Sequence, residues 1–331
     1  MGLVSGTVTR YDATKSVRED FADVIYNIAP TDCPLMSNIG RDTAKQTYTE
    51  WQTDDLATPN TANAVIEGDD APANDTFVPT NRVGNHTQIS RKVVQVSGTV
   101  ESVGLAGIKS MLGYQMAKKA KELKRDMEAI VTSDQVAVVG NNSTPRKLAA
   151  VGAWIISNFH SVGTGTAATP PAMSSGSDGY PNVAPGAAGV KTLFSEPALK
   201  GMIQRVWAKG GDIDDCFVMV GPYNKTVIST FQGIATRYRD TSPGKQAQII
   251  GAADVYVSDF GTVTVVPNRF QPEDRVYLID PSQLALTYLR SFRTIPLAKS
   301  GDNTKRLLLT EWTLKVRNER GLGIERDVTT S

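Results

Sequence analysis

The clearest pattern of hydrophobic and polar positions runs from residue 105 to residue 132. Hydrophobic side chains recur there at spacings of three, four or seven residues, which predicts one long amphipathic helix. At about 1.5 Å per residue such a helix is roughly 40 Å long. A solvated face and a partner-binding face explain the polar side of this helix equally well. That side carries six basic residues: Lys109, Lys118, Lys119, Lys121, Lys124 and Arg125.

The segment before this helix has a different pattern. Two stretches rich in Thr, Gln and Val, residues 46–54 and 85–97, have the composition of strands. The long polar segment between them is broken by prolines and a glycine. Neither strand alternates cleanly between hydrophobic and polar residues, and an isolated two-stranded ribbon is only marginally stable in water. We therefore expect this arm to lie against something other than its own domain.

Charge in this arm is one-sided. From Glu50 to Asn81 there are seven acidic residues and no Lys or Arg. Such a segment requires solvent or a partner of opposite charge. A cation site at Glu67, Asp69 and Asp70 is conceivable because carboxylates on a turn suit Ca²⁺. A solvated acidic tip or a salt-bridged patch is the better interpretation. The acidic residues are Glu50, Asp54, Asp55, Glu67, Asp69, Asp70 and Asp75.

The remaining chain divides by composition. Residues 1–45 resemble an arm with one short helix, closed by Pro30. Residues 161–190 are rich in Gly, Ala, Ser and Pro and predict a flexible surface loop. A compact α/β region follows. In the last long strand, 306–317, alternation predicts Trp312 on a buried face and Glu311 on the opposite, polar face.

Overall composition excludes several classes of protein. The 331 residues include 35 basic and 34 acidic side chains, a net charge of +1, so a dedicated nucleic-acid-binding protein is not indicated. No run of about 18 apolar residues predicts a membrane span. The first residues lack the apolar core of a signal peptide, so we expect synthesis in a cytoplasm, with Cys33 and Cys216 as reduced thiols.

Candidate chemistry is sparse. The two histidines, His86 and His160, have no His, Cys or carboxylate nearby at metal-ligand spacing. Both lie in segments predicted to be peripheral, whereas a catalytic base must be held near its nucleophile. Adjacent carboxylates such as Asp214 and Asp215 point apart on a strand or loop and do not acquire shifted pKa values. We therefore expect no enzyme activity, no cofactor and no metal; a glycan-binding or hydrolytic role is the remote alternative.

Several short motifs are spread along the chain: Glu19-Asp20, Pro30 to Leu35, Ser37 to Gly40, Glu50-Trp51, Glu67-Gly68-Asp69, Asn85, Gln88-Ile89, Val96 to Thr99, Leu123 to Asp126, Glu128 and, more weakly, Gly152 to Ile155 and Glu311 to Leu314. In this combination of motifs the chain resembles the major capsid proteins of SU-10-like tailed bacteriophages, a branch of the HK-97-type capsid fold.

The resemblance implies an α+β HK-97-like fold with named parts. Residues 1–45 would be the N-terminal arm and 46–100 the extended E-loop. Residues 101–160 would be the peripheral domain with a spine helix at 105–132, followed by the flexible surface loop 161–190. Residues 191–280 would be the axial domain, and 281–331 would return to the peripheral domain as strands.

The resemblance also implies a function. Such proteins form, as pentamers and hexamers, the icosahedral shell that encloses the double-stranded DNA of a phage. We expect a virion protein assembled in the host cytoplasm with a separate scaffolding protein, because only about 45 residues precede the loop. A portal and a decoration protein are further expected partners, and packaged DNA would be contacted weakly. A bacterial nanocompartment shell of the same fold is the alternative, distinguished by its protein cargo.

A contact between subunits would explain the charge pattern. Because the tip of a long hairpin points away from its own base, opposite charges on the loop and the helix cannot easily meet within one chain. We hypothesise that the acidic loop of one subunit lies over a basic peripheral surface of the next. That surface would consist of Arg91, Lys92, Lys118, Lys119, Lys121, Lys124 and Arg125.

Overall fold

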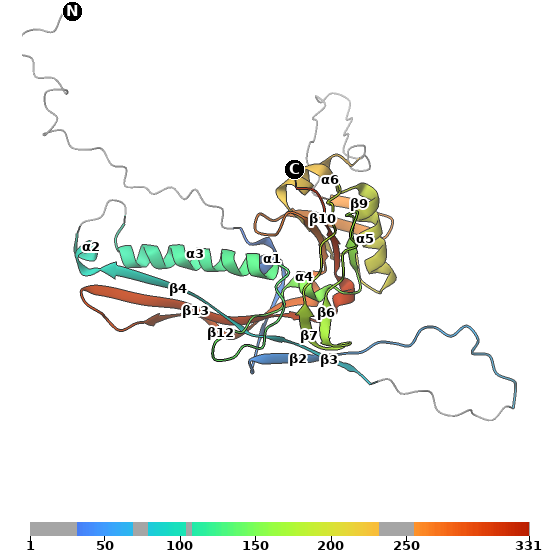
Figure 1. Ribbon diagram of the computed structural model, residues 1–331, viewed down its shortest axis with the longest axis horizontal. Helices are drawn as coiled ribbons and strands as arrows, with labels where there is room; N and C mark the ends of the chain where they lie inside the picture. Colours follow the sequence, from blue (N-terminus) through green and yellow to red (C-terminus); the bar gives the residue numbers. More distant parts are fainter. Residues whose placement is uncertain (1–31, 69–78, 104–107, 232–254, 331) are drawn as a thin grey trace, which may run out of the picture.

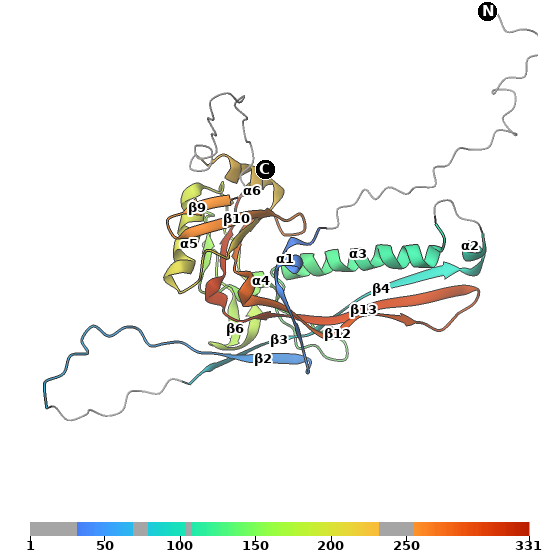
Figure 2. The ribbon, with the colours of Figure 1, turned by 180° about the vertical axis from the view of Figure 1, so that it is seen from behind.

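The computed structural model describes residues 32–68, 79–103, 108–231 and 255–330. It consists of an elongated wing and an α/β unit, with a loop leaving the molecule on the side opposite the wing (Figures 1 and 2). The short helix expected between residues 17 and 28 lies outside the described residues.

The wing is one long helix packed along a four-stranded sheet. Helix α3, Met111–Val131, packs on β4, Gln88–Ser97, and β13, Asn303–Val316. The sheet order is β1-β12-β13-β4, with β1 at Gly40–Thr43 and β12 at Leu284–Pro296.

The long helix was predicted at the right place but with the wrong start. It begins at Met111, not at residue 105, because the Ser110 hydroxyl accepts a hydrogen bond from the Gly113 N–H at 3.1 Å and caps the helix there. A separate short helix, α2 at Gly98–Ser102, precedes it. The 21 residues of α3 correspond to about 31 Å. Its inner face buries Leu123, Met127, Glu128 and Val131.

The base of the loop is a sheet and not a bare ribbon, which corrects two predictions. The predicted strand 85–97 is divided: β3, Asn81–His86, pairs with β2, Tyr48–Thr53, whereas β4 pairs with β13 in the wing. The segment 161–190, predicted as a loop, contains β6, Ala172–Ser175, and β7, Asp178–Val183. These strands extend the ribbon into a sheet of order β2-β3-β7-β6.

Aromatic packing gives this sheet the core that the sequence pattern did not reveal. The Trp51 ring lies 5.5 Å from the ring of Trp154, which belongs to the short helix α4, Val151–Trp154. Tyr180 of β7 packs against the same hydrophobic core. Polar strands are therefore held through a few large side chains and not through regular alternation.

The α/β unit contains a six-stranded sheet of order β5-β14-β11-β8-β10-β9. The C-terminal segment, predicted to return to the peripheral domain as strands, divides between two sheets: β12 and β13 pair in the wing, and β14 pairs with β11 in this second sheet. The strands are β5 Phe159–Ser161, β8 Phe217–Val220, β9 Val255–Ser258, β10 Gly261–Pro267, β11 Arg275–Ile279 and β14 Gly323–Arg326; the helices are α1 Pro34–Asn38, α5 Glu196–Ala208, α6 Pro222–Ser229, and the short η1 Pro281–Gln283 and η2 Glu319–Gly321.

Strand β13 is buried on both faces, so the expectation of an exposed Glu311 is wrong. Glu311 is 3% exposed and contacts two arginines: its Oε1 lies 2.6 Å from Arg146 Nη2 and its Oε2 lies 2.6 Å from Arg290 Nε. The Thr87 hydroxyl also donates to Oε1. Because α3, β3 and α4 also contact β13, a polar side chain in its buried centre must find its partners inside the protein.

We predict that Glu311→Gln lowers the free energy of unfolding by about 3 kcal/mol, because it leaves two buried or half-buried arginines without their carboxylate. Urea unfolding followed by fluorescence measures this loss. Glu122→Gln is the matched control, since Glu122 forms a partly exposed pair with Lys119 on the helix surface, and a surface pair contributes about 0.2–1 kcal/mol. Equal effects of the two substitutions would contradict the assignment.

Candidate functional site

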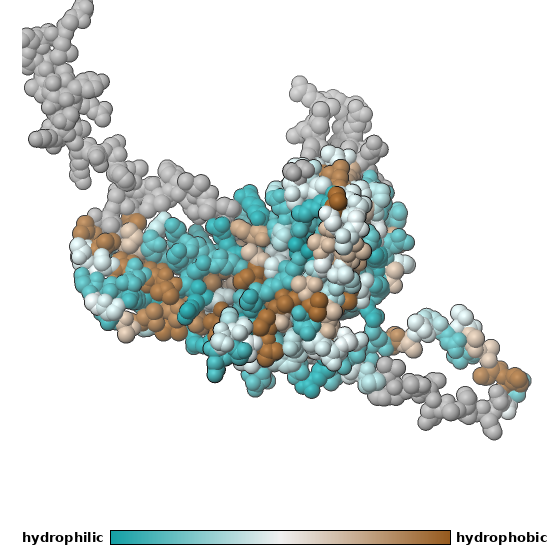
Figure 3. Space-filling view, viewed as in Figure 1, coloured by the Kyte–Doolittle hydropathy of each residue, from teal (hydrophilic) through white to brown (hydrophobic). Residues whose placement is uncertain are grey.

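The loop between β2 and β3 carries large hydrophobic side chains that are exposed to solvent in the single subunit. Its described part extends away from the body (Figure 1). Leu56 is 98% exposed, Val65 78% and Ile66 80%. Figure 3 shows hydrophobic atoms at the far end of this loop. Neighbouring exposed aliphatic side chains on a projecting segment indicate a surface that binds a partner.

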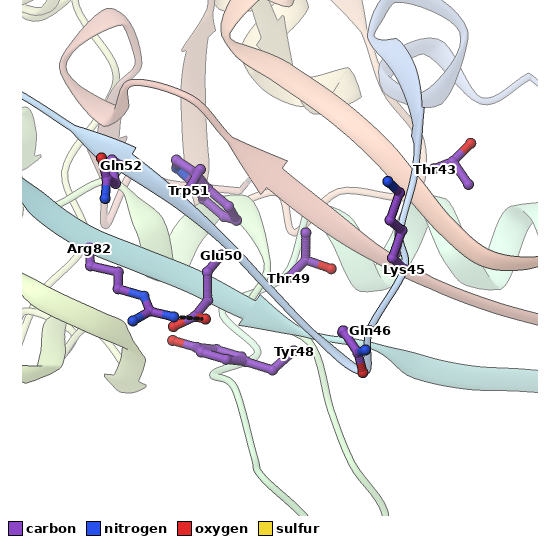
Figure 4. A pocket seen from close by; sticks show the side chains of 10 residues that line it. Thr43, Lys45, Gln46, Tyr48, Thr49, Glu50, Trp51, Gln52 and Arg82 are labelled. Atoms are coloured by element: carbon purple, nitrogen blue, oxygen red, sulfur yellow. Dashed lines mark hydrogen bonds and ion pairs between the residues drawn. The ribbon is translucent and has the colours of Figure 1, made fainter.

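The acidic residues predicted to act together are in fact divided between roles. Glu50 pairs with Arg82 at 2.5 Å (Figure 4), and Asp55 pairs with Arg320 at 2.7 Å. For these two, the expectation that the loop acids find no partner in their own chain is wrong. Arg82 lies one residue beyond the segment that lacks basic residues, and Arg320 is 265 positions from Asp55, too far for a sequence pattern to reveal.

The other acidic residues have no cationic partner among the described residues. Asp54 accepts the N–H of its neighbour Asp55 at 2.9 Å. Glu67 is exposed beside Val65 and Ile66 at the end of the described part of the loop. Asp69, Asp70 and Asp75 lie outside the described residues.

The basic residues divide in the same way. Lys92 pairs with Asp126 at 2.5 Å, and Lys119 pairs with Glu122 at 2.6 Å. The Arg125 guanidinium lies over the Phe270 ring, 5.1 Å from its centre. The remaining four are exposed and form no ion pair within the described part of the chain: Arg91, Lys118, Lys121 and Lys124.

The net charge of +1 conceals a strongly dipolar molecule. The two wing segments, residues 88–131 and 284–317, contain 15 basic and 6 acidic residues, whereas the rest of the chain contains 20 basic and 28 acidic. Sequence reasoning missed this asymmetry because the wing is built from segments that lie far apart in the chain. The wing is thus the positive end of the molecule and attracts acidic partners over a distance of about 8 Å at physiological salt.

A shallow groove of mixed polar and aliphatic lining lies at the end of the wing that is farthest from the loop. It lies between β4 and the start of α3 and has a volume of about 340 Å³. Val93 and Val100, which line it, are 49% and 39% exposed. Lys119 lies at the same groove. Figures 1 and 3 show that this region and the loop occupy opposite ends of the molecule, so a chain cannot fill its own groove with its own loop.

A second groove, of about 520 Å³, lies at the base of the loop and is drawn in Figure 4. Lys45, Tyr48, Trp51 and Arg82 contribute to its lining. It is open, and the side chains in it form a surface ion pair and not a nucleophile with an adjacent base. Its chemistry favours contact with another surface over catalysis.

His86 lies beside this groove at the point where the loop strand β3 ends. It is 7% exposed, with the rings of Tyr48 and Tyr180 at 4.6 and 5.0 Å. Burial, and then the nearby Arg146, lower the pKa of His86 below its usual value. Its Nε2 is buried without a hydrogen-bond partner in the described part of the chain. His86 therefore packs as a neutral aromatic ring that joins three strands.

The second histidine is also structural. The Nδ1 of His160 lies 2.6 Å from the buried carboxylate of Glu325, which is shared with Arg205. Among the residues with assigned positions, no three His, Cys, Asp or Glu side chains form a cluster suited to a metal. Within the same ranges no helix has both the length and the apolar character needed to cross a membrane.

Comparison with known proteins defines the class of protein. A chain of the cyanophage A-1(L) capsid asymmetric unit covers 98% of this chain with a TM-score of 0.66 at 13% identity, and 100% of its own length is matched. The protein of Gordonia phage Cozz covers 99% with a TM-score of 0.60 at 12% identity, and 98% of its length is matched. A chain of the capsid of a native GTA particle covers 95% of this chain with a TM-score of 0.61 at 9% identity, and 96% of its own length is matched. The fold is that of the HK-97-type capsid proteins.

The sequence defines the family within this class. The model of the SU10 major capsid protein matches residues 4–329, so the chain belongs to the SU10 major capsid protein family. It is also 28% identical, over 92% of both chains, to the major capsid protein of Escherichia phage Phieco32. The protein is thus a major capsid protein of a tailed phage, a structural component of the virion.

We predict that acid weakens the base of the loop through His86. The lowered pKa means that the unfolded chain binds a proton more readily than the folded chain. Stability from this residue is therefore complete above the unfolded pKa of about 6.5 and is lost as the pH falls below it. Thermal unfolding between about pH 7.5 and pH 5 measures the loss. His86→Phe keeps the ring contacts and should flatten the dependence, whereas His160→Gln should retain it; an equally steep profile in His86→Phe would refute the assignment.

Proposed function

We propose that the subunits assemble head to tail, as pentamers and hexamers, into a closed icosahedral shell around double-stranded DNA. In this arrangement the loop of one subunit lies on the wing of the next. The observation that carries the proposal is the separation of complementary surfaces. An acidic loop with exposed aliphatic side chains lies at one end of the molecule, and a basic wing with a groove lined in part by valines lies at the other.

Surfaces of this kind generate rings. When two different patches of identical subunits meet, the pair retains one unused patch of each type, and association continues until rotation closes the ring. A hairpin made of 27 residues, the length of the segment 54–80, can reach at most about 45 Å, at about 3.3 Å per residue. That reach exceeds the roughly 31 Å length of helix α3. One loop can therefore span much of a neighbouring wing.

Two kinds of interaction contribute to the contact. A single exposed ion pair contributes only about 0.2–1 kcal/mol. Burial of an aliphatic side chain such as Ile66 contributes about 1.5–3 kcal/mol. The charges therefore direct the approach and the register, while the aliphatic residues supply more of the affinity. Repetition around a closed shell makes even weak contacts decisive, because each new contact forms at high effective concentration.

The proposed assembly has further partners. A separate scaffolding protein, a portal and a decoration protein would take part, and assembly would occur in the host cytoplasm. Packaged DNA would be contacted weakly and without sequence specificity. We propose no catalytic role for the chain. A nanocompartment shell of the same fold would enclose protein and not DNA, so the contents of purified particles distinguish the two functions.

We predict that neutralising the acidic end of the loop weakens shells without unfolding the subunit. The variant is Glu67→Gln with Asp69→Asn and Asp70→Asn, of which the two aspartates lie outside the described residues. Loss of several loop–wing ion pairs should lower the temperature at which shells dissociate, and the defect should shrink in high salt because screening already weakens these pairs in the wild type. Light scattering and electron micrographs during heating measure shell integrity.

The matched control removes three charges elsewhere. Asp212, Asp215 and Asp259 are exposed on the α/β unit, and replacing all three by Asn should leave shells unchanged. Loop-variant shells as resistant to heat and salt as the wild type would mean that the acidic end of the loop is only solvated. That result would refute the proposed contact.

A further inference from the structure

Glu128 is a buried carboxylate for which neither the fold class nor the loop contact provides a role. It lies on the inner face of α3 and is 0% exposed. Its Oε1 accepts the Leu35 N–H at 2.8 Å and its Oε2 accepts the Met36 N–H at 2.9 Å. Oε1 also accepts the Asn268 side-chain amide at 2.7 Å. No Lys or Arg forms an ion pair with it in the described part of the chain.

Burying a carboxylate is costly unless hydrogen bonds replace its hydration. Burial raises the pKa of Glu128, while the hydrogen bonds from Met36 and Leu35 oppose that rise. An apolar residue at this position would avoid the desolvation cost. The carboxylate therefore indicates a positional requirement that hydrophobic packing alone does not meet.

The three donors come from separate parts of the chain. Leu35 and Met36 form the start of α1, which is 93 and 92 residues from Glu128 in sequence. Asn268 follows β10, and its own backbone N–H donates to Val220 O of β8 at 2.8 Å. One side chain thus joins the beginning of the described chain, the long helix of the wing and the sheet of the α/β unit.

We propose that Glu128 is a positioning residue for assembly, which fixes where the N-terminal segment leaves the subunit relative to the wing and the α/β unit. The proposal rests on the proposed function in one respect, that subunits assemble into shells. The two backbone N–H groups at the start of α1 can both be satisfied only if α1 lies against this point of α3. The chain therefore enters α1 at the same place, relative to the wing and the α/β unit, in every subunit.

Glu128→Gln in the full-length protein tests the proposal. Glutamine has the same size, but its NH2 group takes the place of one carboxylate oxygen. Because that NH2 group only donates, it cannot accept the N–H groups that this oxygen accepts in the wild type. Hydrogen exchange at the Leu35 and Met36 amides should accelerate by about tenfold or more, because hydrogen bonds to a charged group are lost. Exchange in the centre of α3 and in β8 should remain within about twofold of the wild type. The yield of closed shells should fall.

A compensating substitution separates positioning from simple packing. In Glu128→Gln with Asn268→Asp, the glutamine amide faces a carboxylate, and its carbonyl oxygen, in the place of Oε2, accepts the Met36 N–H. The Leu35 N–H, which shared Oε1 with Asn268, does not regain an acceptor. Slow exchange should therefore recover at Met36 and not at Leu35, and the shell yield should recover in part. Glu122→Gln on the same helix serves as the control and should change neither quantity.

Three results would overturn the proposal. Unchanged exchange at Leu35 and Met36 in Glu128→Gln would show that the carboxylate does not hold α1. Equal acceleration throughout α3 and the α/β sheet would show a general stabilising role. Normal shell yield despite a released α1 would show that its position does not matter for assembly. The exchange measurement is made on the full-length subunit before assembly and does not depend on the loop contact, so failure of the proposed function remains distinguishable.

Discussion

The separation of complementary surfaces within one chain is the constraint on which the rest of this structure depends. The acidic, partly aliphatic loop and the basic, grooved wing lie at opposite ends of the subunit. An isolated subunit therefore exposes both the loop and the grooved wing to water. In a closed ring every loop meets a wing, so association removes the same unfavourable exposure from every subunit.

This constraint requires a rigid connection between the loop base, the wing and the α/β unit. Buried polar contacts supply it. Asp134, just beyond α3, lies 2.5 Å from Arg275 Nη1 and 2.9 Å from Arg326 Nη2, both on the α/β sheet. The Tyr277 hydroxyl donates to Thr132 O at 2.8 Å. Directional contacts of this kind fix the relative orientation of the two units, which hydrophobic packing alone would specify less strictly.

Sequence patterns predicted those parts of the fold whose signals are local. The spacing of hydrophobic residues located α3, but its start depends on the cap at Ser110, which the pattern extending back to Leu105 obscured. The family motifs predicted the capsid fold and function. The strand alternation in β13 misplaced Glu311, because a central strand covered on both faces no longer separates polar from buried positions.

The candidate surface was only partly predictable, because ion pairs join residues that are distant in sequence. Glu50 and Asp55 find partners in their own chain, whereas Glu67 and the exposed lysines of α3 do not within the described residues. The positive charge of the wing appears only when two separate segments are combined. The groove depends on the packing of β4 beside α2 and α3, which no sequence pattern encodes.

The contact between loop and groove is tested most directly by joining them covalently. In the variant Ile66→Cys with Val100→Cys, oxidised shells should give covalent multimers on a non-reducing gel, and the single variants should show what Cys33 and Cys216 contribute. Ile66→Cys with Val257→Cys is the control, since Val257 is 51% exposed but lies on the α/β unit. Multimers from the first pair alone are the predicted result. Closed shells that remain monomeric on the gel with Ile66→Cys and Val100→Cys would contradict the account.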